Sequence, residues 1–280
     1  MNFYDIMMKR RSIRYFKDQK ISEQIINDLL DAANNAPSGG NIQPISIILI
    51  KEAEGKIKLA QMVGAQPWVK NAPLSMLFCI DFYRLKKWAS ISNTKFIGEN
   101  AFSHFLIAYA DLMCAAQNIV ILAESYGLGS VYVGSIQSSI DKARQYFSIP
   151  KYVLPLMVLS IGYPKSVPKT IPKLKRDIII HDEKYKILSD DEIEKAYDNK
   201  YGDFDNNTDI YLEKAYIEVI EASKQHEKNW AELAKKRMKK LGIKNHAQFL
   251  FNLRYPSEAM IKLNGKQIQE FKNAGFDFFS

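Results

Sequence analysis

The pattern of apolar residues in the first 80 positions predicts one helix followed by two strands. Behind Ser22, which can cap a helix, apolar residues return at helical spacing as far as Ala33. The residue before a proline disfavours helical angles, so this helix should stop before Pro37. The runs 45–50 and 74–80 are apolar except for one serine each and have the length of strands, so they predict two buried strands of a sheet.

The longest apolar stretch runs from Ala101 to Tyr126 and is apolar on nearly every side. As a helix it would be roughly 39 Å long, and it is expected to be a buried central element that can also pack against a second subunit. Gly127 should end it in the left-handed conformation. Its polar residues argue against a membrane span, and we expect His104 and Asp111 to be packed or capping groups rather than catalytic ones. The polar residues of this stretch are His104, Asp111, Gln117, Asn118 and Glu124.

Two more strands and a helix are predicted after this long helix, and the composition of the chain then changes. Short strands are predicted at 131–134 and 154–161, with a helix over 139–147 between them. From about Lys165 the chain is rich in proline and cations, and after that it is largely polar. We therefore expect one αβ core, followed by a less regular extension.

The boundary between these two parts is placed near residue 188. The core is expected to span residues 1–188, and the extension, 189–280, is expected to be largely helical and to pack on the core or on a partner. A basic amphipathic helix is predicted from about Lys224 to Leu241. In a chain of net charge +8 this helix raises the alternative of a module that binds nucleic acid or an acidic partner. Aromatic residues are nearly absent from it, with Trp230 as the exception, so a solvated face is the better interpretation.

Composition adds little to this picture except for the cysteines. The chain has 280 residues, of which 47% are hydrophobic and 25% charged, as in an ordinary globular protein. Cys79 and Cys114 both lie in apolar runs, so we expect buried, reduced thiols of the kind found in the cytosol. With two cysteines and scattered histidines, no metal site is expected. The N-terminus lacks the pattern of a signal peptide, and a cytoplasmic location is expected.

Cations and a hydroxyl are concentrated near the N-terminus, at Arg10, Arg11, Ser12 and Arg14. In an extended segment residues 10, 12 and 14 share a face, and in a helix Arg10 and Arg14 lie one turn apart. Either way two guanidinium groups can converge on one anion, and their paired planar donors suit phosphate. The small, polar segment 36–44 follows, and its glycines suit a loop whose backbone approaches a ligand.

Several segments in the same order resemble the nitroreductase family of FMN flavoproteins, in particular the NADPH-dependent, oxygen-insensitive nitroreductase and flavin reductase branch. The resemblance covers residues 1 to about 188 and is looser around Trp230 and over 271–276. It implies an α+β fold, with a mostly antiparallel mixed sheet flanked by helices around a long central helix, in an intertwined homodimer. The matching segments are 10–14, 36–44, 64–66, 115–118, 123–129, 131–134, 149–156 and 162–164.

The resemblance also implies a set of FMN-binding residues. The N-terminal cluster would hold the phosphate and ribityl chain, Gln66 would contact the ring, and residues 132–135 would pass beneath it. The segment 38–41 would reach the flavin of the partner subunit. The whole set is Arg10, Arg11, Ser12, Arg14, Ser38, Gly39, Gly40, Asn41, Gln66, Tyr132, Val133, Gly134, Ser135, Lys173 and Lys175.

A second basic contact to the phosphate is implied after the last core strand. The segment 172–174 with His181 downstream resembles a Pro-Arg-Leu pattern followed by histidine in that branch, and Lys173 takes the place of the arginine. Lysine keeps the charge but loses the bidentate fork. Where relatives often have another lysine, this chain has Ile171, and its place could be taken by Lys169, Lys175 or Arg176.

The activity implied is FMN-dependent oxidation of NADPH or NADH, with electrons passed to a nitro compound, a quinone or free flavin by a ping-pong mechanism. Chemistry at the flavin N5 requires no protein nucleophile, and no catalytic side chain is expected. Two sites would lie at the interface of a homodimer. The other alternative is a family member with diverged flavin chemistry, such as a dehalogenase or a flavin-destroying enzyme.

Overall fold

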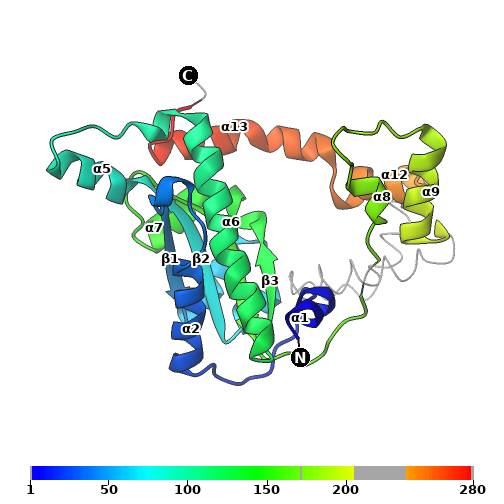
Figure 1. The fold of residues 1–280 in the computed structure, drawn as a ribbon, viewed down its shortest axis with the longest axis horizontal. Helices are drawn as coiled ribbons and strands as arrows, with labels where there is room; N and C mark the ends of the chain where they lie inside the picture. Colours follow the sequence, from blue (N-terminus) through cyan, green and yellow to red (C-terminus); the bar gives the residue numbers. More distant parts are fainter. Residues whose placement is uncertain (1, 171, 205–237, 279–280) are drawn as a thin grey trace. The chain divides into compact units, whose positions relative to one another are not determined.

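The computed structural model describes residues 2–170, 172–204 and 238–278 (Figure 1). The chain divides into two compact units. The first comprises Met1–Pro168 and Leu263–Ser280, and the second comprises Lys169–Lys262. The functional boundary expected near residue 188 stays a prediction.

The first unit is built on an antiparallel sheet with the strand order β1-β2-β4-β3. Its strands are β1 (Ile45–Ile50), β2 (Leu74–Asp81), β3 (Gly129–Val133) and β4 (Val153–Gly162). The central strands β2 and β4 are buried at every position, which explains why their sequences are mostly apolar. All the predicted strands are confirmed, with ends shifted by a residue or two. The expected burial of the first one is wrong, because β1 lies at an edge of the sheet and is mostly half-buried.

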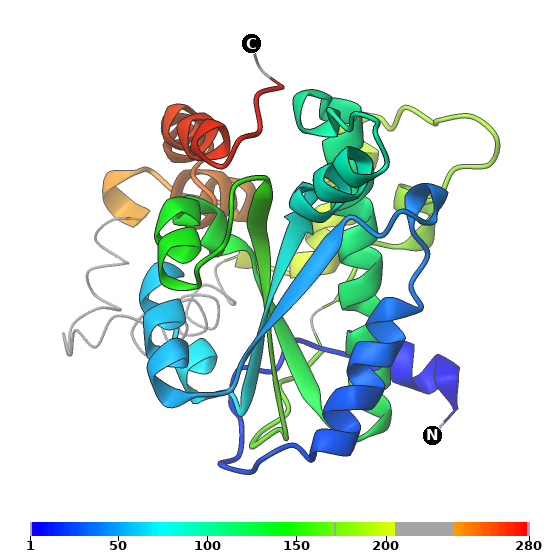
Figure 2. The ribbon, with the colours of Figure 1, turned by 90° about the vertical axis from the view of Figure 1, so that its left-hand side faces the viewer.

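One face of the sheet is covered by α2 (Glu23–Asn34) and α6 (Phe102–Ser125), as Figure 2 shows. The hydroxyl of Ser22 accepts a hydrogen bond from the backbone N–H of Ile25 at 3.3 Å, so the predicted cap is confirmed. Gly127 follows α6 with φ of +71°, as expected for a left-handed terminus. The apolar side chains of both helices pack against those of β2 and β4.

The other face of the sheet carries α3 (Ala53–Met62), α4 (Pro67–Asn71) and α7 (Ile140–Tyr146) (Figure 2). Only α7 corresponds to a predicted helix. The apolar residues of α3 and α4 do not form a long periodic pattern, so these two helices could not be predicted from periodicity. The sheet therefore lies between two layers of helices, and its antiparallel strands make the fold α+β.

The long helix α6 is buried in the single chain only on the side that faces the sheet, so the expected central position is confirmed, and packing of the other side against a second subunit stays a prediction. Leu112, Ile119 and Val120 are fully buried against the sheet. On the other side Leu106 is 51% exposed. By length and composition α6 could cross a membrane, a test that the core helices of soluble proteins also pass. A helix that packs on one sheet can bury only the face turned toward that sheet.

The two cysteines differ in their surroundings. Cys79 is buried in β2, and burial raises the pKa of its thiol. Cys114 lies on the uncovered side of α6 and is exposed, so the expectation of burial is wrong there. Apolar neighbours in the sequence did not show which side of the helix Cys114 occupies.

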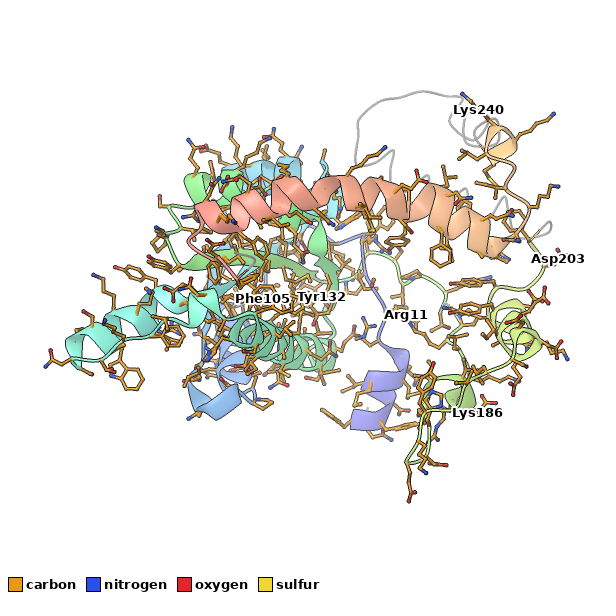
Figure 3. The ribbon with its side chains drawn as sticks, turned by 90° about the horizontal axis from the view of Figure 1, so that it is seen from above. Arg11, Phe105, Tyr132, Lys186, Asp203 and Lys240 are labelled. Carbon is orange, nitrogen blue, oxygen red and sulfur yellow. The ribbon has the colours of Figure 1, made fainter. Side chains whose placement is uncertain are left out.

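The C-terminal residues return to the first unit beside α5 (Phe82–Ile91). The ring of Phe276 lies 5.4 Å from that of Phe82, and Phe278 lies 5.1 Å from Phe105, which is labelled in Figure 3. The backbone N–H of Tyr152 donates to Ala274 at 2.7 Å. These contacts make the closing aromatic residues part of the core.

The second unit contains the helices α8 (Arg176–Ile179), α9 (Asp190–Tyr201) and α12 (His246–Phe249), a π-helical turn at Leu250–Arg254, and the start of α13 (Ser257–Asn273). Ser189 and Glu192 form a capping box at the start of α9. Of the predicted basic helix, residues 224–237 lie outside the described residues.

Candidate functional site

The N-terminal cationic segment is extended. Helix α1 (Phe3–Lys9) ends at Arg10, whose backbone turns to ψ of 135°. Ser12 forms a parallel bridge with Ser130 of β3, and the N–H of Ile13 donates to Ser130 at 2.9 Å. Ile13 is buried, so Ser12 and Arg14 project to the opposite side from it. Of the two conformations that the sequence left open, the extended one is confirmed.

Gly129 allows the segment to lie this close to β3. A Cβ at this position would stand 2.3 Å from Cγ1 of Ile13, which is closer than real side chains approach. The first residue of β3 therefore has to be a glycine if the N-terminal segment is to run beside the strand. The same strand leads directly to Gly134 and Ser135, so one edge of the sheet joins two groups of predicted site residues.

Gln66 and Ser135 come together although they are far apart in the sequence. The side-chain amide of Gln66 donates to Oγ of Ser135 at 3.2 Å, and this hydroxyl donates to the carbonyl of Val63 at 3.0 Å. Ser135 and Gly134, in the turn Gly134–Ser138, are exposed. The turn therefore presents backbone and small polar groups to the outside.

Arg14 lies next to this pair. Its guanidinium carbon stands 5.4 Å from the ring centroid of Trp68, a cation–π contact. Trp68 is buried in α4 and follows Gln66 by two residues. The N-terminal segment, Gln66 and Ser135 thus form one cluster, which we call the cradle: Arg10, Ser12, Arg14, Gln66, Tyr132, Val133, Gly134 and Ser135.

Two more charged residues lie near the cradle, Arg11 and Glu124. The side chain of Arg11, which follows α1 (Figure 3), donates to the carbonyls of Lys9 at 2.9 Å and Pro168 at 2.8 Å. Burial raises the pKa of Glu124, and the neighbouring Arg10 and Arg11 lower it. Arg11 is therefore engaged in holding the chain, which the sequence did not reveal.

Tyr132 is anchored to α6. Its hydroxyl donates to Oε1 of Gln117 at 3.1 Å. Burial raises the pKa of Tyr132 to about 12, against the opposing effect of Arg10. The phenol is therefore neutral at ordinary pH, and it is a packed hydrogen-bond donor rather than an acid–base group.

The predicted site loop 38–41 lies apart from the cradle in the single chain. It includes the short 3-10 turn Gly39–Asn41 and leads into β1, whereas Gly134 and Ser135 follow β3. The strand order places β1 and β3 at opposite edges of the sheet. Within the part of the chain that the structure describes, no hydrogen bond joins this loop to the cradle. One chain therefore holds the predicted site residues in two separate groups.

Asp111 and Arg84 contact the loop and were not predicted as site residues. Asp111 accepts hydrogen bonds from Ser38 and Gly39, and Arg84 donates to the carbonyls of Gln43 and Ile45. Both residues line a cavity of about 250 Å³ behind the loop. The sequence signal for Asp111 is an acid within a mostly apolar helix, which predicts a packed or capping group, and the hydrogen bonds to the loop agree with that prediction.

Lys173 and Lys175 are exposed residues of the second unit. Lys175 is the residue before α8, and its side chain forms no cap. Their assignment to a phosphate stays a prediction.

Comparisons with known proteins agree on one family. A model described as "Nitroreductase family" matches residues 7–163. The FMN reductase (NAD(P)H) of Bacillus subtilis strain 168 is 32% identical over 200 residues, covering 70% of this chain and 80% of that protein. The solved structure of the nitroreductase NfrA1 from B. subtilis has a TM-score of 0.70 and 28% identity, covering 92% of this chain and 98% of the other. The NADPH:FMN oxidoreductase of Vibrio harveyi, solved in complex with NAD+, has a TM-score of 0.66 and 29% identity, covering 71% of this chain and 84% of the other.

Proposed function

The chain belongs to the nitroreductase family, and from this premise we propose that it is an FMN-dependent oxidoreductase that takes electrons from NADPH or NADH. The similar proteins are named as reductases of FMN, as a nitroreductase and as an NADPH:FMN oxidoreductase. They favour this activity over a dehalogenase, a flavin-destroying enzyme or a nucleic-acid-binding protein.

The donor set of the cradle fits the phosphate end of FMN. Arg14 and Arg10 supply guanidinium groups, and Ser12 supplies a hydroxyl on the extended segment between them. These are the groups that form charge-assisted hydrogen bonds with a phosphate. The convergence of this segment with Gln66 and Ser135 is the single observation that carries the proposal.

The turn after β3 fits the flat ring of the flavin. Gly134 has no side chain, and the nearest atom to a Cβ built there would be Cε of Met157 at 3.9 Å. The backbone is thus uncovered, and a planar ring can lie directly on it. Gln66 can offer its amide to the ring edge, and the turn is preceded by the half-buried Tyr132 and the buried Val133. Bound FMN would supply the electron-accepting and electron-donating N5 atom.

We further propose that the protein acts as a cytoplasmic homodimer on a small-molecule electron acceptor. The loop 38–41 and the cradle are separated within one chain, so a loop from a second copy would complete each site. The uncovered apolar side of α6 offers a surface for that copy. Lys173 is proposed as a further phosphate contact, with Lys175 as the alternative.

Steady-state kinetics will test this function. FMN-loaded protein should oxidise NADPH or NADH only when a nitro compound, a quinone or free flavin is supplied, with the parallel double-reciprocal lines of a ping-pong reaction. The comparison of both nucleotides identifies the preferred donor. If the FMN-loaded protein turns over neither nucleotide with any of these acceptors, the proposed activity is wrong.

A further inference from the structure

The loop 38–43 has an unusual backbone. Gly40, Asn41 and Gln43 have φ values of +59°, +54° and +47°. Residues other than glycine rarely adopt this left-handed region, and such conformations persist only where the surrounding structure enforces them. The loop therefore needs anchors at both of its ends.

The first anchor is Asp111, a buried acid of α6. Its carboxylate accepts hydrogen bonds from Oγ of Ser38 at 2.9 Å and from the N–H of Gly39 at 3.0 Å. The same Ser38 oxygen accepts from the N–H of Gln43 at 3.0 Å. One carboxylate therefore fixes the start of the loop directly and its end through Ser38. Hydrogen bonds to a charged acceptor are the strong ones.

Gly39 lets the loop reach this acid. A Cβ on Gly39 would stand 2.5 Å from Cγ2 of Ile107 and 3.9 Å from the carboxylate of Asp111. The loop backbone thus lies directly on α6, and donors of the loop itself, Ser38 and Gly39, hydrogen-bond the buried carboxylate.

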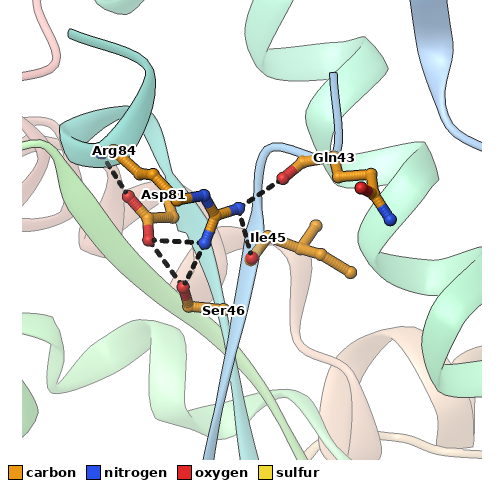
Figure 4. Close-up of polar contacts among 5 residues, drawn as sticks. All are labelled: Gln43, Ile45, Ser46, Asp81 and Arg84. Carbon is orange, nitrogen blue, oxygen red and sulfur yellow. Dashed lines mark hydrogen bonds and ion pairs between the residues drawn. The ribbon is translucent and has the colours of Figure 1, made fainter. Parts of the chain in front are cut away.

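The second anchor is Arg84 of α5, drawn in Figure 4. Its Nη2 donates to the carbonyl of Gln43 at 2.6 Å and to that of Ile45 at 3.1 Å. Its Nη1 lies 3.5 Å from Asp81, whose carboxylate also accepts from Ser46. The strained residue Gln43 is therefore held at its N–H by Ser38 and at its carbonyl by Arg84.

We propose that Asp111, supported by Arg84, is a positioning residue that holds the loop 38–43 in the shape in which it contacts the flavin of the partner subunit. This inference rests on the proposed function. Asp111 does not touch the cofactor itself, and it acts through Ser38 and Gly39. A buried acid on the central helix would thereby link the core of one subunit to the site of the other.

Substitutions at Asp111 and Ser38 test this role. Asp111→Ala removes both acceptors, Asp111→Asn keeps one of them, and Ser38→Ala breaks the link to Gln43 from the loop side. The matched control is Asp28→Asn, because Asp28 on α2 also accepts a hydrogen bond from a hydroxyl, that of Tyr126. The readouts are the FMN dissociation constant of the apo-protein, amide hydrogen exchange of residues 38–43, and the thermal midpoint.

We expect Asp111→Ala to weaken FMN binding about tenfold or more, and Asp111→Asn and Ser38→Ala to weaken it less, as loss of a charge-assisted hydrogen bond implies. Amide hydrogen exchange of residues 38–43 should accelerate in all three of these variants. The control Asp28→Asn should match the wild type in FMN affinity and in exchange. If the exchange or the thermal midpoint changes while FMN affinity stays at the wild-type value, Asp111 is merely structural and the inference is wrong. A wild-type protein that binds no FMN would overturn the proposed function as well.

Discussion

Arg14→Ala is expected to weaken FMN binding roughly ten- to a hundredfold, because a charge-assisted hydrogen bond contributes about 1.5–3 kcal/mol. Arg14 lies over the ring of Trp68, in the helix that Gln66 precedes, and this contact ties the N-terminal segment to the rest of the cradle. Titration of the apo-protein with FMN, followed by quenching of flavin fluorescence, measures the change. Arg14→Lys should bind with intermediate affinity, since it keeps the charge but loses the planar fork.

The neighbouring Arg11 provides the matched comparison for this substitution. Its side chain is already engaged by the carbonyls of Lys9 and Pro168, so Arg11→Ala should weaken FMN binding less than Arg14→Ala. Thermal unfolding of each variant checks that the fold is retained. Equal affinities for wild type and a folded Arg14→Ala variant would remove Arg14 from the phosphate site.

Leu106→Lys is expected to convert a homodimer into monomers and to release FMN. Leu106 is 51% exposed in the single chain, on the uncovered side of α6, so lysine there should be tolerated by the monomer. Leu106 is already about half-buried in the single chain, and in a symmetric interface the change occurs twice, so the lost apolar burial alone would cost about 1.5–3 kcal/mol, roughly one to two powers of ten in the dimer dissociation constant. Sedimentation should give twice 32.2 kDa for the wild type and 32.2 kDa for the variant.

Ile57→Lys is the control for the dimer. Ile57 is a 38% exposed apolar residue of α3, on the opposite face of the sheet, and lysine there should leave both the dimer and the FMN content unchanged. A wild-type monomer that holds one FMN per chain would contradict the proposal that each site needs two subunits.

Much of the core could be predicted from the sequence because its elements have strong local patterns. The apolar runs of β2 and β4 and the capped periodicity of α2 predict their type and their ends. The exposure of one side of α6 could not be predicted in this way. An almost wholly apolar helix looks alike from all sides, and only the packing against one sheet decides which side is left open.

The parts of the candidate site that consist of neighbouring residues in the sequence could be predicted. The cationic segment and the segment 132–135 carry recognisable residue types, and the structure brings them together along β3. The roles of Asp111, Arg84 and Arg11 depend on contacts between residues far apart in the chain. The sequence shows the charges of these residues, and the partners that decide their roles become visible only in the fold.

Anaerobic spectroscopy of the purified protein tests the central claim most directly. We predict a yellow protein with the absorbance spectrum of bound FMN, which is bleached by stoichiometric NADPH or NADH and recovers its colour when a nitro compound or a quinone is added. A folded protein that remains colourless after incubation with FMN, or a bound flavin that neither nucleotide bleaches, would contradict the account.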